Sequence, residues 1–144
     1  MQKNVFTFGD NEFHVEVEEE GIKIRGRIDH IDDNCIWELK TVKNLYYYIE
    51  KPDSNHVKQI MIYLHAFKRD KGRIVYIEKN TLQIIEHEIN YDNNIFKDIM
   101  AQFTEVHKCL VEKKLPEKLK DYPNNFKCQV CDFKEKCGKD ENIE

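Results

Sequence analysis

Hydrophobic and polar residues alternate through the first part of the chain. Two alternating runs, residues 13–17 and 22–28, are separated by the glycine-containing turn Glu18–Gly21. This alternation places every second side chain in a core, and two such runs joined by a short turn predict a β-hairpin. A second turn, rich in Asp and Asn at residues 32–34, leads to a third strand that we expect from Cys35 to Thr41.

The pattern then changes from strand-like to helical. Residues 43–53 show no period, and we expect an irregular segment there that ends near Pro52. From that point to about Lys68 the apolar residues are spaced as in an amphipathic helix, and Ser54 or Asn55 is suited to be its N-cap. The predicted order up to this point is therefore three strands followed by one helix.

The remaining elements complete an α+β pattern. Two further strands are predicted at residues 73–79 and 82–89, and a second helix is predicted from about Asn93 to Lys113. The apolar stripe of this second helix consists of Ile95, Ile99, Phe103, Val106 and Leu110. We therefore predict an α+β fold, in which a mixed β-sheet flanked by helices occupies residues 1–115. A cysteine-containing tail, residues 116–144, packs on this core within one structural domain.

Composition narrows the class of protein. A chain of 144 residues with 40% apolar residues can fold around a single core. It has neither an apolar leader nor a run of membrane-spanning length, so we expect a soluble, cytoplasmic protein with no membrane partner. The net charge of −4 provides no overall positive field for nucleic acid, although a local grip on strand ends does not require one. Five cysteines, an odd number, favour metal ligation or burial over a disulfide framework.

An acidic pair and a lysine lie at the end of the second predicted strand and on the third. Glu38 and Lys40 must point to the same face because side chains alternate along a strand, and the turn at residues 32–34 brings Asp29 alongside Glu38. The two carboxylates and the backbone carbonyl of Leu39 would suit Mg²⁺ or Mn²⁺, and Lys40 could orient water or neutralise a phosphate. Taken alone, such charges are more often solvated residues at a sheet edge.

The helix that follows carries a second polar group. Gln59 and Tyr63 are four residues apart and share one helix face, with His56 one turn earlier. These residues could be hydrogen-bonded polar groups of a core, or they could belong to the same site as the acidic pair. The sequence pattern around them bears on this choice.

The motifs appear in the order Gly-x-x-Asp, Glu-x-Lys-Thr and Gln-x-x-x-Tyr. This order resembles the PD-(D/E)XK nuclease superfamily in its RecB-like branch. The resemblance implies a restriction-endonuclease-like core, with Asp29 and Glu38 as the metal-binding acids and Lys40 as the catalytic lysine. Gln59 and Tyr63 match the motif that follows them, and all five positions are candidate catalytic residues. An isoleucine replaces the proline of the superfamily's name.

Three cysteines near the end of the chain, Cys128, Cys131 and Cys137, have the spacing C-x2-C-x5-C. The triplet resembles the C-terminal cluster of the CRISPR-associated iron–sulfur exonucleases (the fourth Cas family) and of the AddB-type recombination nucleases. That resemblance implies a [4Fe–4S] cluster, for which four thiolates are the usual ligands. Zn²⁺ accepts the same ligands, and three free surface cysteines are the remaining alternative.

The sequence departs from those families in its N-terminal part. In them a helix before the first strand carries a fourth cysteine and a further His or Glu of the active site. Here no cysteine precedes Cys35, which we expect in the core, and Cys109 is a candidate for the fourth ligand. The alternatives to Cys109 as the fourth ligand are a non-protein ligand, a cysteine from a partner, or a gene whose N-terminus has been shortened. His14 or one of Glu18–Glu20 could replace the first-motif residue.

Three functions follow from these features. The leading hypothesis is a metal-dependent DNA exonuclease that acts on single-stranded or frayed ends in CRISPR adaptation or recombination, with CRISPR integrase proteins as partners. The second is a non-cleaving module that binds DNA ends or docks on an integrase and keeps a structural metal cluster. The third is a regulatory protein with a zinc-ribbon tail. The retained acidic pair and lysine favour the first, because a pure binding module does not need them.

Overall fold

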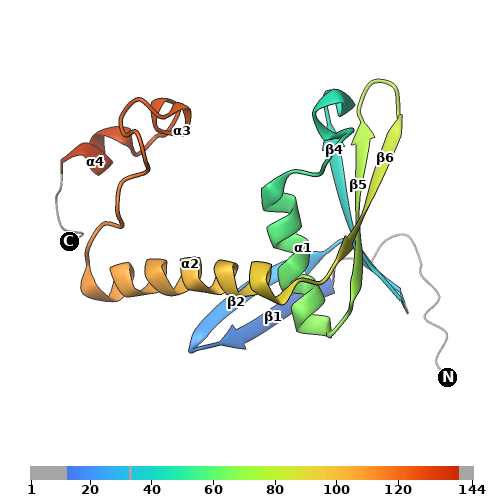
Figure 1. The fold of residues 1–144 in the computed structure, drawn as a ribbon, viewed down its shortest axis with the longest axis horizontal. Helices are drawn as coiled ribbons and strands as arrows, with labels where there is room; N and C mark the ends of the chain where they lie inside the picture. The colour runs from blue at the N-terminus through green and yellow to red at the C-terminus, as the bar shows by residue number, and fades with distance from the viewer. Residues whose placement is uncertain (1–12, 33, 140–144) are drawn as a thin grey trace. The chain divides into compact units, whose positions relative to one another are not determined.

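A computed structural model describes residues 13–32 and 34–139 of the chain (Figure 1). The described residues fall into two compact units, one that ends at Ile99 and one that begins at Met100. The first unit begins with an antiparallel hairpin of β1 (Phe13–Glu19) and β2 (Ile22–Ile28). The turn between these strands uses positive φ angles at Glu20 (53°) and Gly21 (77°). The predicted N-terminal hairpin is confirmed.

The centre of this unit is a four-stranded mixed sheet in the order β3-β4-β5-β6. Its strands are β3 (His30–Ile31), β4 (Ile36–Val42), β5 (Lys71–Glu78) and β6 (Ile84–Asn90). β4 and β5 are parallel, whereas β3–β4 and β5–β6 are antiparallel. The predicted α+β fold with a mixed sheet is therefore confirmed. Asp33, part of the second predicted turn, lies outside the described residues.

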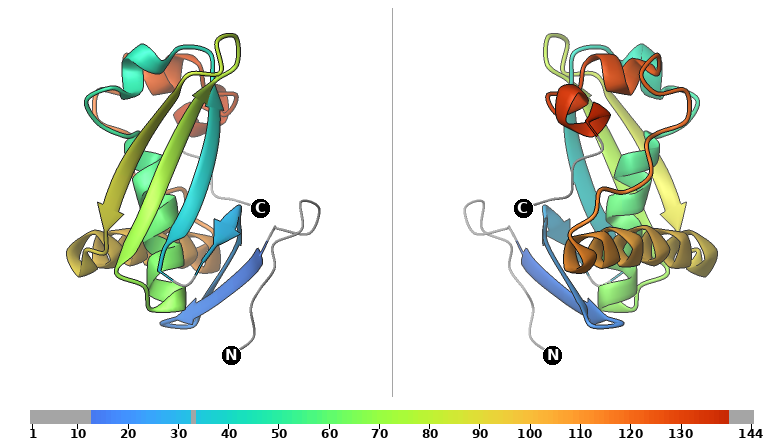
Figure 2. Two further views of the ribbon diagram at one scale, coloured as in Figure 1. Left: turned by 90° about the vertical axis from the view of Figure 1, so that its right-hand side faces the viewer. Right: turned by 90° about the vertical axis from the view of Figure 1, so that its left-hand side faces the viewer.

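A crossover helix, α1 (Ser54–Phe67), connects the two parallel strands and lies across one face of the sheet (Figure 2). Its apolar residues Ile60 and Leu64 are fully buried, as are Ile36 of β4 and Ile74 of β5. The helix is capped by Asp53, whose side chain accepts a hydrogen bond from the backbone N–H of Asn55, and not by Ser54 or Asn55 as predicted. The prediction missed the cap by one residue because all three residue types favour the N-cap position.

The segment predicted to be irregular contains a short 3₁₀ helix, η1 (Leu45–Tyr48). Its first turn is closed by the Asn44 side chain, which accepts a hydrogen bond from the backbone N–H of Tyr46 at 2.8 Å. A run of one buried leucine and three tyrosines has no helical or strand period, so its conformation depends on tertiary packing and not on pattern. The prediction of an irregular segment was wrong for these four residues.

The second long helix, α2 (Asn93–Glu112), extends from the first unit into the second. Of its predicted apolar stripe, Ile99 is buried, whereas Phe103, Val106 and Leu110 are exposed. The second unit also contains the short helices α3 (Phe126–Gln129) and α4 (Lys134–Gly138). None of the helices in the described part of the chain is long and apolar enough to span a membrane.

Candidate active site

Asp29 and Glu38 come together because of the register of the sheet. β3 pairs with β4 so that His30 lies opposite Trp37, and this register places Asp29, one residue earlier, beside Glu38. The Asp29 carboxylate accepts a hydrogen bond from the backbone N–H of Leu39 at 2.8 Å, which fixes it against β4. The pairing that the sequence predicted between the two acidic residues is thus present in the fold.

Glu38 is the one buried charged residue in the described part of the chain, with 2% of its surface exposed. One carboxylate oxygen, Oε1, is 2.5 Å from Nζ of Lys40. The other oxygen, Oε2, is buried and has no hydrogen-bond partner among the described residues. Burial raises the pKa of Glu38, the negative charge of Asp29 raises it further, and the hydrogen bond from Lys40 opposes both effects. A buried, unpartnered carboxylate oxygen is costly, and a cation would remove that cost.

Lys40 is tied to the crossover helix by a chain of hydrogen bonds. Its ammonium group donates to Oε1 of Gln59 at 3.0 Å, and Nε2 of Gln59 donates to the hydroxyl of Tyr63 at 3.1 Å. Because an ammonium group can only donate, it holds the oxygen of the Gln59 amide toward Lys40 and leaves the nitrogen for Tyr63. Four of the five positions predicted as catalytic are therefore joined in one hydrogen-bond network that runs from β4 to α1, and Asp29 lies beside it, bonded to the backbone of β4.

A glycine of β2 makes room for this network. A Cβ atom at Gly26 would lie 2.7 Å from Cε1 and 2.8 Å from the hydroxyl of Tyr63, closer than such atoms approach in folded proteins. The absence of a side chain at Gly26 allows the tyrosine ring to pack directly on the strand. This glycine opens the Gly-x-x-Asp motif, but sequence analysis assigned it no role of its own, because its effect depends on a contact between distant segments.

The donor set suits a hard divalent cation. Mg²⁺ is usually held by one or two carboxylates and completes its coordination with water and substrate phosphates. Asp29 and Glu38 supply two carboxylates, and Oε2 of Glu38 lacks any other partner among the described residues. Within the described ranges no three His, Cys, Asp or Glu side chains gather to form a fuller protein site. The carbonyl of Leu39 as a further ligand stays a prediction.

His56 lies on α1, one turn before Gln59, and sequence analysis assigned it no role. Its Nδ1 is 2.9 Å from the hydroxyl of the fully buried Tyr76, which also accepts a hydrogen bond from the backbone N–H of Asp53. Burial lowers the pKa of His56, and the positive charge of Lys40 lowers it further. Its spacing of three residues from Gln59 was the only sequence signal.

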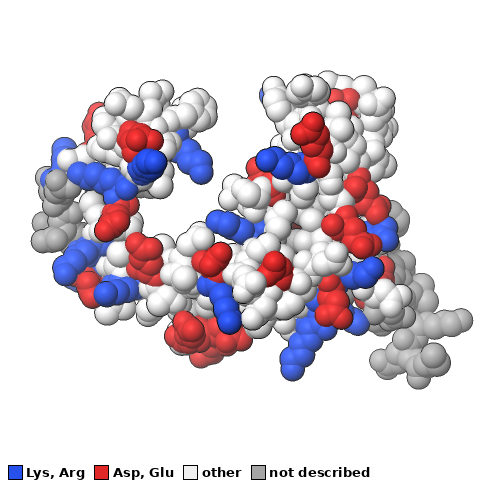
Figure 3. All heavy atoms as spheres, viewed as in Figure 1, with Lys and Arg blue, Asp and Glu red and all other residues white. Residues whose placement is uncertain are grey.

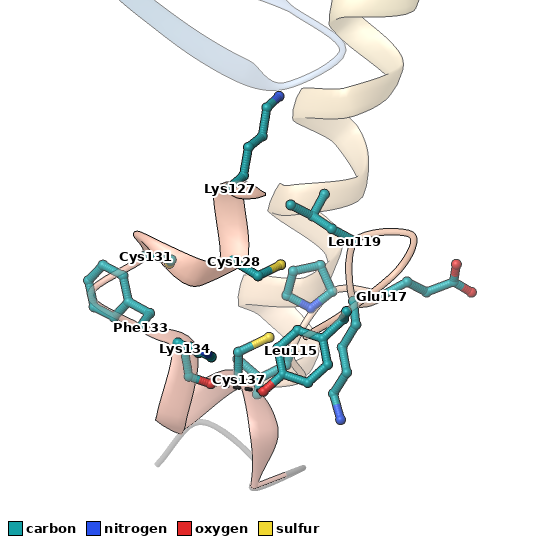
Figure 4. Close-up of a pocket in the computed structure, with 12 residues that line it drawn as sticks. Leu115, Glu117, Leu119, Lys127, Cys128, Cys131, Phe133, Lys134 and Cys137 are labelled. Carbon is teal, nitrogen blue, oxygen red and sulfur yellow. Dashed lines mark hydrogen bonds between the residues drawn. The ribbon is translucent and has the colours of Figure 1, made fainter. Parts of the chain in front are cut away.

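The three tail cysteines line one cavity of about 320 Å³ in the second unit. Figure 4 shows the sulfur atoms of Cys128 and Cys137 pointing into the same space. Cys128 is buried, Cys137 is half-buried and Cys131 is exposed, and the described residues contain no group of three thiols close enough to hold one ion. Cys109, although described, is not among the residues that line the cavity. Cys35 is buried, as expected.

The candidates for the missing first-motif residue lie on β1 and its turn. His14 is exposed, and Glu18 and Glu20 are exposed as well. Glu19 accepts a hydrogen bond from Nε2 of His65 at 3.1 Å, which pairs it with α1 and not with Asp29 or Glu38. Glu19 is thus engaged with α1, and the choice of His14 or one of Glu18–Glu20 as the first-motif residue stays a prediction.

A mixed sheet that brings Asp, Glu and Lys together on neighbouring strands, with Gln and Tyr on the crossover helix, defines a restriction-endonuclease-like core. Residues 3–138 match the family model described as the PD-(D/E)XK nuclease superfamily, and the chain belongs to this superfamily. None of the curated proteins matches the chain.

Solved structures show the same fold. SSO0001 is 27% identical with a TM-score of 0.54, covering 91% of this chain and 59% of that one. LHK-Exo, an alkaline exonuclease from Laribacter hongkongensis solved in complex with dAMP, is 17% identical with a TM-score of 0.54, covering 70% and 58%. A putative exonuclease from Eubacterium rectale is 13% identical with a TM-score of 0.56, covering 95% and 54%. The chain thus spans less than two thirds of the length of each.

Proposed function

We propose that this protein is a divalent-metal-dependent DNA exonuclease of the RecB-like type. The observation that carries the proposal is the buried, unpartnered Oε2 of Glu38 beside Asp29 and Lys40. Asp29 and Glu38, with the carbonyl of Leu39, would hold Mg²⁺ or Mn²⁺. When bound, the cation supplies the Lewis acidity for attack of water on a phosphodiester. Superfamily membership supports this assignment, because these nucleases typically use divalent metals.

The chain's own residues place a positive charge at the reacting phosphate. Lys40 is held between Oε1 of Glu38 and Oε1 of Gln59, so its ammonium group has a fixed position in the partly buried site. An ammonium group fixed before the reaction stabilises negative charge that develops on a phosphate oxygen without any reorganisation. Tyr63 contributes by orienting the Gln59 amide.

The substrate class is the end of a DNA strand, single-stranded or frayed. LHK-Exo, which shares the fold, is an exonuclease that was solved with a mononucleotide, dAMP. Mononucleotides are what an exonuclease releases from strand ends, which supports the same product class here. The resemblance to the CRISPR-associated exonucleases carries the proposal to the processing of DNA ends before integration or in recombination, and direct binding of a purified CRISPR integrase would test that step.

A cleavage assay tests the proposal. Wild-type protein should shorten end-labelled linear single-stranded DNA in Mg²⁺ or Mn²⁺, should be inactive in EDTA, and should leave circular single-stranded DNA intact. Asp29→Ala and Glu38→Ala should abolish cleavage, and Lys40→Ala should lower the rate about 10²–10³-fold. Glu16→Ala is the matched control, because Glu16 pairs on the surface with Lys23. Equal cleavage in EDTA, or full activity of Glu38→Ala, would show that the assignment is wrong.

The second candidate is a DNA-end-binding or integrase-docking module that no longer cleaves. The observation in its favour is that only two carboxylates meet at the site, with no third His, Cys, Asp or Glu beside them among the described residues. The same assay separates the two functions. A module of this kind would bind DNA ends in Mn²⁺ with wild-type affinity after Glu38→Ala, and wild-type protein would leave every substrate uncut.

For the tail we propose a [4Fe–4S] cluster, with Zn²⁺ as the alternative, at Cys128, Cys131 and Cys137. The proposal is supported by the fact that all three cysteines line one cavity, and it requires Cys131 to turn inward. Protein purified without oxygen should be brown and should contain iron, and Cys131→Ala should prevent its incorporation. Cys109→Ala would have the same effect only if Cys109 is the fourth ligand. Colourless protein with stoichiometric zinc would overturn the iron assignment.

A further inference from the structure

Two tyrosines of η1 are exposed for a geometric reason. A 3₁₀ helix has three residues per turn, so residues three apart lie on the same side. Leu45 is buried, and Tyr48 stacks on the buried Tyr76 with ring centroids 4.2 Å apart and an interplanar angle of 17°. Tyr46 and Tyr47 are therefore directed to the other side, where 74% and 75% of their surfaces are exposed.

The helix that carries these rings is anchored to the sheet at both ends. The backbone N–H of Leu45 donates to a carboxylate oxygen of Glu78 on β5 at 3.4 Å. At the other end, Nε2 of His87 on β6 donates to the carbonyl of Tyr48 at 2.6 Å. Because the backbone is already fixed, a ligand that stacks on the tyrosines would not need to order the segment first.

The two exposed rings present their faces in different directions. Their centroids are 5.9 Å apart and their planes meet at 80°, so the contact is edge to face. No other ring contact is recorded for either tyrosine among the described residues, and the neighbouring Ile49 is 58% exposed. Single exposed aromatic residues are common on protein surfaces, but an adjacent pair on a fixed support is a typical stacking platform for unpaired bases.

Charge and position favour a nucleic acid as the occupant. Exposed lysines, Lys43 and Lys51, lie on either side of the platform in the sequence, with one exposed acidic residue, Glu50, between them. Figure 3 shows a largely uncharged surface over η1, with both basic and acidic side chains beside it. Tyr46 follows Lys40 by six residues, so their Cα atoms are at most about 22 Å apart, a distance that a few nucleotides span.

We propose that Tyr46 and Tyr47 form a stacking platform for the unpaired bases of a single-stranded nucleic-acid end. This inference rests on the proposed nuclease function and adds the part of the substrate that the protein grips. The bases on the platform are nucleotides of the same strand whose phosphate lies at the acidic pair. Duplex ends would not use it, because paired bases keep their faces stacked on each other.

Binding by a cleavage-deficient protein tests the platform. Glu38→Gln protein in EDTA is titrated onto a fluorescein-labelled single-stranded 12-mer and onto a blunt-ended duplex of the same length, and anisotropy is measured. Tyr46→Ala and Tyr47→Ala should each weaken single-strand binding about tenfold and leave duplex binding unchanged. Tyr46→Phe and Tyr47→Phe should bind as the parent does, because stacking needs the ring and not the hydroxyl. Phe67→Ala, at the far end of α1 and 37% exposed in the parent, is the aromatic control.

Three results would overturn the proposal. The first is unchanged single-strand affinity in folded Tyr→Ala variants, and the second is an equal loss of affinity for the duplex. The third is a dimer that becomes a monomer on Tyr→Ala substitution, since the occupant would then be a second copy of the chain. The assay is independent of cleavage: wild-type protein that cuts no DNA while the tyrosine variants lose single-strand binding would refute the nuclease function and leave the platform standing.

Discussion

Replacing Glu38 by glutamine should stabilise the metal-free protein. Oε2 of Glu38 is buried without a partner among the described residues, and leaving such a group unsatisfied costs about 1–3 kcal/mol. Glutamine keeps the shape of the side chain and removes the buried charge. Its amide nitrogen takes the place of Oε2 without a partner, but a neutral unpartnered group costs less than a charged one. A domain of this size changes its Tm by about 2–4 °C per kcal/mol, so a gain of about 2 kcal/mol would raise the Tm by roughly 4–8 °C.

The stability that Glu38→Gln gains over the wild-type protein should depend on pH. Because burial raises the pKa of Glu38 above its ordinary value of 4.5, the folded protein binds more protons at this site than the unfolded chain does between the two values. The stability of the wild-type protein therefore falls as pH rises through that interval. The advantage of Glu38→Gln should be absent below pH 4.5 and complete above the raised pKa.

A divalent cation should make the wild-type protein more stable than the Glu38→Gln variant. A ligand that binds only the folded state at 100 times its Kd stabilises by about 2.7 kcal/mol, and the glutamine variant should gain little of this. The assay is thermal unfolding of both proteins in EDTA and across a Mn²⁺ titration, at pH 5 and pH 8. Glu16→Gln is the control: Glu16 is paired on the surface with Lys23 and Arg25, so its loss should leave the Tm nearly unchanged.

Two outcomes would refute this reasoning. If Glu38→Gln is less stable than the wild-type protein in EDTA at pH 8, the unpartnered oxygen carries no cost in the folded state. If Mn²⁺ stabilises both proteins equally, Glu38 is not a ligand. Either result would remove the observation on which the proposed function depends.

Three further predictions concern the surroundings of the acidic pair. Gln59→Ala should lower kcat about 10–100-fold with little change in KM, because Lys40 loses the group that positions it; steady-state kinetics measures both values. Gly26→Ala should cost about 1–3 kcal/mol in urea unfolding, because its methyl group overlaps the Tyr63 ring, and the same substitution made in a Tyr63→Ala background should cost little. Burial and the charge of Lys40 lower the pKa of His56 below 6.5, so His56 should not titrate near pH 6.5 in the pH–rate profile. An ionisation at that pH that disappears in His56→Gln would contradict this prediction.

Much of the fold could be predicted because its elements have clear periods. The hairpin of β1 and β2, the crossover helix α1 and both later strands lie within a few residues of their predicted bounds. η1 was missed, because its three tyrosines have no period and its shape is set by stacking on Tyr76. The short strand β3 was missed for the same kind of reason: two residues are too few to show alternation.

The site was predictable where motif and strand geometry agree. Alternation along β4 places Glu38 and Lys40 together, and the helical period pairs Gln59 with Tyr63. The contact between Lys40 and Gln59 joins segments far apart in the chain, so the sequence could indicate it only through the family resemblance. Roles that depend on such contacts alone were missed, as for Gly26. The tail's metal ligands stay a prediction, since spacing does not fix how the thiols are oriented.

The most direct test of the account compares cation occupancy and cleavage in the same samples. Mn²⁺ bound per chain is measured by electron paramagnetic resonance, and the single-turnover rate on linear single-stranded DNA is measured at each Mn²⁺ concentration. The account predicts that the rate rises in proportion to occupancy, and that Asp29→Ala loses both. Cleavage without bound Mn²⁺, or full occupancy and full activity in Asp29→Ala, would contradict it.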